Sequence, residues 1–311
     1  MKKPKNPVVA LGIFDGVHIG HAKVLNEAIK RANAIKGTSV ALTFSPHPLE
    51  VLSPKTAPPL LTSIGHRMKL IISLGVDLCC PVRFDKKLSN LTPDQFVRKI
   101  LVDNLGAKEV VVGYDFVFGK GRRGDIKTLE ELGKRYGFKV REVKPVKVRG
   151  IIVSSSRIRT LIESGGLQTA SSLLGRPVSI LGTVVKGDLR ARRLGYPTAN
   201  IKPEHEVIPP PDIYAVMVKI GGVRKRGILY IGTRPTFPLA GRVPTKTGRS
   251  ITPVVEVHIL DYCKKIYGKV IEVLFIKRLR SEKKFKNQDD LIKQIKKDEK
   301  EARSYFSLYK P

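Results

Sequence analysis

Two histidines three residues apart, His18 and His21, lie in the segment GIFDGVHIGH at residues 12–21. The segment follows VVAL, a short apolar run typical of a buried strand, and precedes AKVLNEAIKRANAIK, whose apolar residues recur at helical spacing. It is therefore predicted to be a strand-to-helix turn. The N-terminus of a helix offers free N–H groups and a positive dipole, which suit a bound phosphate.

The glycines and histidines of this turn together favour a nucleotide site. Gly12, Gly16 and Gly20 let a nucleotide approach the backbone, and side chains three apart in the first helical turn can point at the same phosphate. We expect His18 and His21 to donate hydrogen bonds to the α-phosphate of ATP, whose charge rises as it is attacked, without a covalent intermediate. The alternative is that the two imidazoles only cap the helix or pack against the sheet.

Composition restricts the class of protein. A chain of 311 residues with 41% hydrophobic content is long enough for two folded domains, and no apolar run approaches the roughly 20 residues of a membrane span. The basic start MKKPKNP is followed by only a brief apolar run, which does not fit a signal peptide. Three cysteines with no disulfide or metal-ligand spacing fit a reducing cytoplasm, and we expect a cytoplasmic protein without a membrane partner.

The charge is strongly positive. Fifty-eight Lys and Arg residues against 27 Asp and Glu give +31, which suits a polyanion such as nucleic acid or an anionic membrane surface. However, the basic residues are spread along the chain, Trp is absent and aromatic residues make up only 6%, so stacking platforms for single strands are not evident. We therefore expect no specific nucleic-acid partner, and the excess charge and the oligomeric state stay open.

Strands and helices alternate through the first half of the chain, which predicts an α/β domain with a parallel sheet covered by helices on both faces. Ligands of such sheets bind beyond the carboxyl ends of the strands. Residues 12–21, SPHP at 45–48 and GYDFVFGKGRRGD at 113–125 each begin where a predicted strand ends. We expect these segments to converge on one crevice.

After Gly175, segments rich in Val and Ile follow one another with turns between them, which predicts an antiparallel barrel or sandwich. NQDDLIKQIKKDEKEAR, near the end, predicts an amphipathic helix that closes this domain. We place the boundary near Arg176–Pro177, giving domains at 1–176 and 177–311.

The motifs resemble, in order, those of the bacterial bifunctional riboflavin kinase/FMN adenylyltransferase (FAD synthetase) family. GIFDGVHIGH is similar to that family's G-x-F-D-G-x-H-x-G-H signature, and VVGYDFVFGKGRRGD, VSSSRIR, LGYPTANI, IGTRPTF and VEVHILDY resemble its later blocks. The HxGH motif is shared with other nucleotidyltransferases and with class I aminoacyl-tRNA synthetases, but PTAN with a downstream glutamate indicates a flavokinase. The resemblance implies an HxGH adenylyltransferase domain followed by a β-barrel kinase domain, Mg²⁺, ATP as co-substrate, and riboflavin, FMN and FAD as substrates or products.

In the first domain the resemblance implies catalytic roles for His18 and His21. SSSRIR places three hydroxyl groups before a helix with two arginines, a cradle for the departing pyrophosphate, although serine-rich helix caps also occur without ligands. Asp115 either holds the nucleotide or flavin or simply caps its turn. The expected residues that bind ATP or flavin are Gly12, Phe14, Asp15, His47, Asp115, Ser155, Ser156 and Arg157.

In the second domain the resemblance assigns Glu256 as the base that accepts the proton of the ribityl 5′-hydroxyl. A carboxylate in the apolar strand VVEVHIL is costly unless it faces a site. Thr198 and Asn200 are expected to bind Mg²⁺ with ATP, the alternative being that Asn200 only satisfies a turn after Pro197. The expected ATP-binding residues are Gly182, Lys186, Gly187, Arg190 and Pro197.

Three features depart from the family pattern: Ala191 replaces a usual glycine, Ile13 replaces a frequent asparagine, and the segment 238–253 is longer than expected. None removes a residue with an assigned role. Two alternatives stay open: the altered loops leave an enzyme with only one activity, or the excess charge marks a basic nucleic-acid-binding protein on this scaffold.

Overall fold

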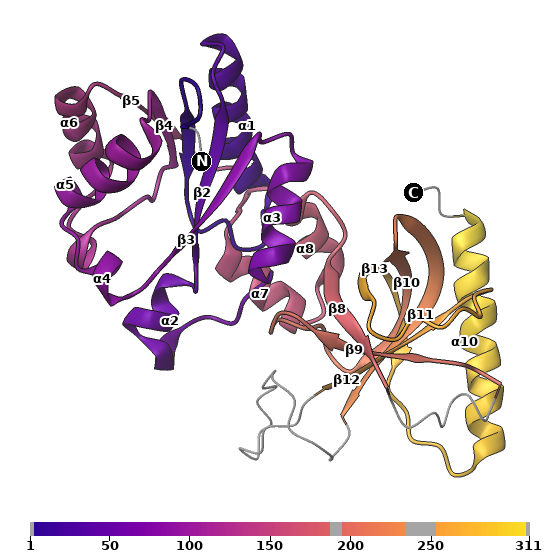
Figure 1. Cartoon of the computed structure of the whole chain (residues 1–311). Coiled ribbons are helices and arrows are strands. Elements are labelled where there is room, and N and C mark those ends of the chain that lie inside the picture. Colours follow the sequence, from indigo (N-terminus) through magenta and orange to yellow (C-terminus); the bar gives the residue numbers. More distant parts are fainter. Residues whose placement is uncertain (1–2, 187–194, 234–252, 309–311) are drawn as a thin grey trace. The chain divides into compact units, whose positions relative to one another are not determined.

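The computed structural model describes residues 3–186, 195–233 and 253–308. Gly187, Arg190 and Ala191, and all of the 238–253 segment except residue 253, lie outside the described residues. The chain divides into two compact units, Met1–Ile158 with Leu173–Gly175, and Arg159–Ser172 with Arg176–Pro311. Figure 1 shows the helices and strands of both units.

The first unit is built from alternating strands and helices, and α7 and α8 contribute residues to both units. The elements are β1 Val8–Leu11, α1 Ile19–Ala34, β2 Ser39–Ser45, α2 Pro48–Leu52, η1 Pro54–Thr56, α3 Ile64–Ser73, β3 Leu78–Arg83, α4 Lys86–Ser89, α5 Pro93–Phe96, η2 Val97–Leu105, β4 Glu109–Gly113, η3 Lys120–Arg122, α6 Ile126–Tyr136, β5 Lys139–Val143, β6 Lys147–Val148, β7 Ile151–Ile152, α7 Ser155–Glu163 and α8 Leu167–Leu174.

The sheet of this unit has the strand order β3-β2-β1-β4-β5, and every pairing is parallel. Because side chains alternate along a strand, β1 divides between two cores. Val9 and Leu11 pack with residues of η2 and α6, whereas Val8 and Ala10 pack with residues of α1 and α3. Helices therefore cover both faces of the sheet, which confirms the predicted α/β architecture.

This strand order brings the predicted site segments to one edge of the sheet. β2, β1 and β4 are neighbours and run parallel, so the segments that follow them leave from the same edge. The chain reverses its direction of progress across the sheet at β1, between β2 and β4, and such a switch point is where open α/β sheets bind ligands.

The second unit contains a closed barrel with the strand order β10-β11-β12-β9-β8-β13, which decides between the predicted barrel and sandwich. Its described elements are β8 Ser179–Val185, β9 Ala199–Pro203, β10 Asp212–Ile220, β11 Val223–Thr233, β12 Pro253–Ile259, β13 Val270–Ser281 and α10 Gln288–Leu308. The strand β9 was not predicted from the sequence. This short strand, ANIKP, pairs with both β8 and β12 and completes the barrel.

The helix α10 lies along the outside of the barrel (Figure 1). Its Ala302 and Phe306 pack with Ala215 of β10, and its buried Asp298 accepts hydrogen bonds from Arg280 of β13, the shortest at 2.7 Å. The predicted amphipathic helix therefore closes this unit. Among the described residues no helix combines the length and the apolar character needed to cross a bilayer.

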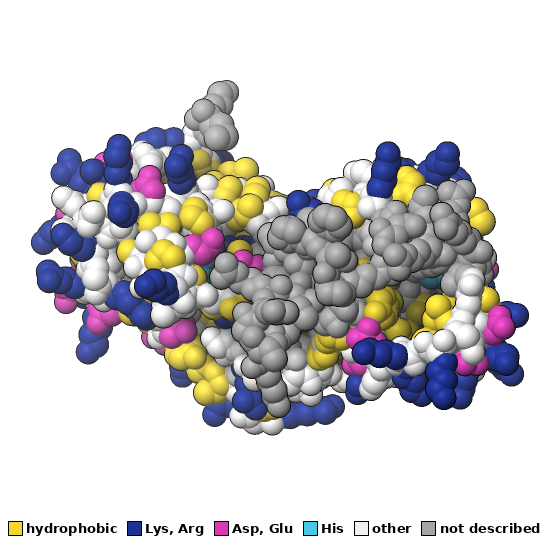
Figure 2. Space-filling view, turned by 90° about the horizontal axis from the view of Figure 1, so that it is seen from below, with side chains coloured by type: hydrophobic (Ala, Val, Ile, Leu, Met, Phe, Trp, Pro, Cys, Tyr) yellow, Lys and Arg dark blue, Asp and Glu magenta, His cyan; other side chains and the backbone are white. Residues whose placement is uncertain are grey.

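Lys and Arg side chains are spread over both units on the face shown in Figure 2. This agrees with their even distribution along the sequence.

Candidate active sites

The turn between β1 and α1 has an unusual backbone. Phe14, Gly16 and Val17 have φ angles of 54°, 80° and 38°, in the left-handed region that favours glycine. A Cβ atom at Gly12 would lie 2.9 Å from Cε1 of Phe14, and one at Gly16 would lie 2.7 Å from Cδ1 of Leu61. These glycines are thus required by the packing of the turn itself, besides any access they give a nucleotide.

The two histidines meet at the N-terminus of α1. His18 is the N-cap, and its Nδ1 accepts a hydrogen bond of 3.1 Å from the backbone N–H of His21. The imidazole rings are stacked with centroids 3.6 Å apart, and Phe14 meets the His21 ring edge-on at 5.4 Å. The capping alternative is therefore real for His18, whose Nδ1 takes part in the cap, and the stacked ring of His21 lies beside it at the N-terminus of the helix.

Asp15 faces the protein. Its side chain is 2% exposed, and its carboxylate accepts hydrogen bonds from the N–H groups of Leu61 and Thr62, both at 3.0 Å. The buried guanidinium of Arg67 lies 3.5 Å from the same carboxylate and donates to the carbonyl groups of Ile13 and Phe44. Sequence reasoning missed Arg67, because nothing in HRMKLII distinguishes a buried arginine from a surface one.

The segments after β2 and β4 place one predicted residue each at the same edge. His47 is buried and caps α2 by accepting a hydrogen bond of 3.1 Å at Nδ1 from Leu49, while its own N–H donates to Glu50. Asp115 is exposed in the turn after β4, which is closed by a hydrogen bond from the N–H of Phe116 to the carbonyl of Gly113. Asp115 is thus open to solvent, whereas His47 is held in a capping box.

The N-terminus of α7 is tied to the turn after β1. The hydroxyl group of Ser155 donates a hydrogen bond of 2.9 Å to the backbone carbonyl of Asp15. Ser156 and Arg157, the next two residues of the helix, are exposed. Two helix N-termini therefore meet at this edge, with a positive dipole from each and an exposed arginine beside them.

A second cluster lies on the outside of the barrel. Glu256 of β12 pairs with Asn200 of β9 on one side and with Tyr230 of β11 on the other. The hydroxyl group of Thr198 donates a hydrogen bond of 3.3 Å to Oε2 of Glu256. The structure thus brings Thr198 and Asn200 beside Glu256, which lies 58 positions after Thr198 in the chain.

Glu256 avoids the burial cost that its apolar neighbours in the sequence implied. Val255 and Val257 are buried at 2% and 0% exposure and face the barrel interior, whereas Glu256 and His258 are half-buried on the opposite face. Side chains of β12 alternate between the two faces of the strand, so the half-buried carboxylate does not have to offset the cost of full burial. Its place beside Thr198 and Asn200 is what now supports a site.

The other predicted kinase residues have different surroundings. Gly182 is buried in β8, and a Cβ atom there would lie 2.5 Å from the carbonyl oxygen of Lys202, so this glycine permits the close approach of β8 and β9. Lys186 is exposed just after β8. Pro197 is exposed, and its carbonyl lies 2.9 Å from Nδ1 of His258, a contact that sequence reasoning missed.

Oxygen atoms dominate this cluster. The described residues hold no group of three or more His, Cys, Asp or Glu side chains that could bind a metal ion by themselves. The hydroxyl of Thr198 and the amide oxygen of Asn200 are oxygen donors of the kind that Mg²⁺ prefers, and Mg²⁺ commonly completes its shell with water and phosphate. The donor set fits a magnesium ion brought with a nucleotide.

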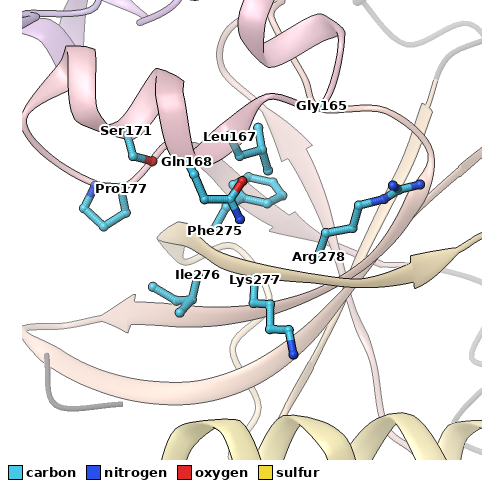
Figure 3. Close-up of a pocket in the computed structure, with 9 residues that line it drawn as sticks. All are labelled: Gly165, Leu167, Gln168, Ser171, Pro177, Phe275, Ile276, Lys277 and Arg278. Carbon is cyan, nitrogen blue, oxygen red and sulfur yellow. The ribbon is translucent and has the colours of Figure 1, made fainter. Parts of the chain in front are cut away.

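A small hollow of about 230 Å³ in the second unit contains none of the predicted site residues (Figure 3). Its charged residues are already engaged, since Lys277 pairs with Glu301 and Arg278 pairs with Asp212. The hollow is lined by Gly165, Leu167, Gln168, Ser171, Pro177, Phe275, Ile276, Lys277 and Arg278.

Comparison with known proteins gives matches to both halves of the chain. Residues 1–157 match the family model described as FAD synthetase, and residues 174–306 match the one described as riboflavin kinase. The chain is 37% identical to the bifunctional riboflavin kinase/FMN adenylyltransferase of Escherichia coli strain K12, with 98% of this chain and 94% of that protein covered. It is 36% identical to the protein of the same name from Bacillus subtilis strain 168, with coverages of 96% and 92%. A crystal structure described as a macrolide-efflux protein from Streptococcus pneumoniae has a TM-score of 0.83 and 30% identity, with 97% of this chain and 95% of that chain covered.

Proposed function

The chain belongs to the bifunctional riboflavin kinase/FMN adenylyltransferase family, and from this we propose which residues carry each of its two reactions. The enzyme phosphorylates riboflavin to FMN with ATP and then adenylylates FMN to FAD, releasing pyrophosphate. We assign the adenylyltransferase to residues 1–176 and the kinase to residues 177–311. The observation that carries this conclusion is the identity to bifunctional relatives over nearly the whole chain, with one candidate site in each half.

In the adenylyltransferase, FMN attacks the α-phosphate of ATP and pyrophosphate leaves. The stacked imidazoles of His18 and His21 lie at the N-terminus of α1, where donors and the helix dipole stabilise the charge that grows on the α-phosphate. Ser156 and Arg157 at the start of α7 bind the departing pyrophosphate. Asp15 is a positioning residue, because its carboxylate binds the N–H of Leu61 and its backbone carbonyl binds the hydroxyl of Ser155, which fixes the turn after β1.

The remaining residues of this site line the nucleotide and flavin. Gly12 and Phe14 shape the turn, and His47 and Asp115 stand beyond the ends of the two strands that flank β1.

In the kinase, the ribityl 5′-hydroxyl of riboflavin attacks the γ-phosphate of ATP. Glu256 accepts the hydroxyl proton, a role worth on the order of 10² to 10⁴ in rate. Thr198 and Asn200 would hold Mg²⁺, which would supply positive charge to the phosphate oxygens of ATP. Lys186 and Pro197 contact the nucleotide, and Gly182 supports them through the packing of β8 on β9.

We place the enzyme in the cytoplasm, since a reducing compartment suits its three free cysteines. Its proposed partners are its small-molecule substrates. The efflux description belongs to the similar crystal structure, and both family models and both bacterial relatives name flavin chemistry instead.

Two single variants test the assignment of roles. The protein is incubated with Mg²⁺, ATP and either riboflavin or FMN, and the flavins are separated by chromatography over time. His21→Ala should leave FMN formation intact and abolish FAD formation, whereas Glu256→Gln should abolish FMN formation and leave FAD formation from FMN intact. A single change that abolished both activities in a folded protein would contradict the two-site assignment.

A further inference from the structure

The segment that leads into β9 is held by a side chain and not by strand pairing. The pairs between β9 and β12 begin at Ala199 with Val257 and continue with Asn200 and Glu256. One step further out, Pro197 has no N–H group and cannot extend the ladder as a donor. Its carbonyl group therefore needs a donor from elsewhere if the segment is to keep a fixed course.

His258 supplies that donor. Its Nδ1 lies 2.9 Å from the carbonyl oxygen of Pro197, so Nδ1 carries the hydrogen and donates it. The same imidazole meets the ring of Tyr196 edge-on, with centroids 5.7 Å apart and planes inclined by 73°. One side chain of β12 thus contacts two consecutive residues of the incoming segment.

The contact has a direct consequence for Thr198. This residue lies between Pro197, whose carbonyl is bound by His258, and Ala199, whose backbone is paired with β12. With both neighbours fixed, the Thr198 side chain is held where its hydroxyl donates to Glu256 at 3.3 Å. Glu256 and His258 are two residues apart and lie on the same face of β12. This face therefore carries both the carboxylate that Thr198 contacts and the imidazole that holds the residue before Thr198.

We propose that His258 is a positioning residue of the riboflavin kinase, which latches the Pro197 carbonyl through Nδ1 and so fixes Thr198 for Mg²⁺ and ATP. The proposal rests on the proposed kinase function of this cluster. His258 acts here through Pro197 and Thr198 and is given no contact with substrate. Loss of this hydrogen bond should weaken the binding of ATP with Mg²⁺ more than it lowers the rate of phosphate transfer once ATP is bound.

Two amide variants probe which ring nitrogen matters. His258→Asn places an amide N–H close to the position of Nδ1, whereas His258→Gln places it close to the position of Nε2. Steady-state riboflavin kinase kinetics are measured with ATP varied at fixed excess Mg²⁺. We expect His258→Ala and His258→Gln to raise the KM for ATP by about three- to tenfold, the loss typical of one hydrogen bond. His258→Asn should stay within about twofold of the wild type.

The same preparations carry the internal controls. Formation of FAD from supplied FMN should be unchanged in all three variants, because the adenylyltransferase residues lie in the other unit. Kinase rates of His258→Ala at saturating ATP should return to near the wild-type kcat, which shows that the barrel is folded. A fall in kcat at unchanged KM in all three variants, or equal KM values for the Asn and Gln variants, would overturn the latch. Wild-type protein that forms no FMN from riboflavin would instead overturn the kinase assignment, and this role with it.

Discussion

Gly20 is the position where one added methyl group should separate stability from activity. It is the second residue of α1, and a Cβ atom there would lie 3.0 Å from Cε1 and 3.1 Å from Nδ1 of His18. Such contacts are tighter than ordinary van der Waals packing, so the His18 ring must move by a few tenths of an ångström. Its Nδ1 is the atom that accepts the capping hydrogen bond from His21.

The stability change should be small because two effects oppose each other. Alanine in place of glycine favours a helix by up to about 1 kcal/mol, and a weakened N-cap costs about 1 kcal/mol. The free energy of unfolding of Gly20→Ala should therefore stay within about 1 kcal/mol of the wild type. The rate of FAD formation from FMN should fall by about 10² to 10³, the range for loss of one oriented donor at a developing charge.

The chain offers a matched control. Gly65 is also the second residue of its helix, α3, whose N-cap Ser63 accepts a hydrogen bond from the N–H of His66 in the same way. A Cβ atom at Gly65 would have nothing within 4 Å. Gly65→Ala should leave both activities unchanged and raise the unfolding free energy by up to about 1 kcal/mol.

Denaturant unfolding and flavin chromatography on the same preparations supply both readouts. A Gly20→Ala variant that forms FAD at a rate within a few-fold of the wild type, or whose riboflavin kinase activity falls in parallel, would contradict the role proposed for the His18 ring.

Two further predictions follow from groups outside the active sites. Hydrogen bonds from Arg31 and then Arg141 lower the pKa of the buried Glu109 from 4.5 to about 2, so its stabilising contribution is complete above pH 4.5 and is lost as the pH falls towards 2. The unfolding free energy of the wild type should drop by at most about 3 kcal/mol over that pH range. The actual drop should be smaller, because solvent screens the two partly exposed arginines. Glu109→Gln should remove the drop when denaturant titrations are repeated at each pH. Burial raises the pKa of the Cys79 thiol to about 11, so at pH 7.5 a thiol reagent should modify the exposed Cys263 first, and mass spectrometry that found Cys79 modified earlier would contradict this.

The elements of the first unit were largely predictable because their patterns are local. The apolar run before Gly12, the helical spacing after it and the repeated strand-helix order are enough to predict a parallel sheet. The turn was also predictable as a candidate phosphate site, since glycines and closely spaced histidines lie between a strand end and a helix N-terminus. What the pattern could not show is that Phe14 and Val17 adopt left-handed angles, because tertiary packing imposes them.

In the barrel, the residues of the proposed site could be named from the sequence, but their geometry could not be predicted. Thr198, Asn200 and Glu256 were named from a resemblance, whereas β9 was missed because five residues ending in proline carry too weak a signal for a strand. Without β9 there is no register, and without register Asn200 cannot be placed opposite Glu256. His258 was missed for the same reason, since its partner is a backbone carbonyl that only the strand pairing brings near.

Asp15 shows how a motif residue can serve a site without facing it. Four separate segments are held to the turn through Asp15 and Arg67. The Asp15 carboxylate accepts hydrogen bonds from the N–H groups of residues 61 and 62, and the Asp15 carbonyl accepts one from Ser155. The guanidinium of Arg67 lies beside the same carboxylate and donates to the carbonyl of Phe44. A nucleotide ligand at this carboxylate would have to displace those bonds, at a cost of about 1–3 kcal/mol for each group left unsatisfied. The aspartate of the turn is therefore better understood as the residue that holds two helix N-termini together at the end of β1, beside the histidines and the exposed Arg157 that we propose as phosphate ligands.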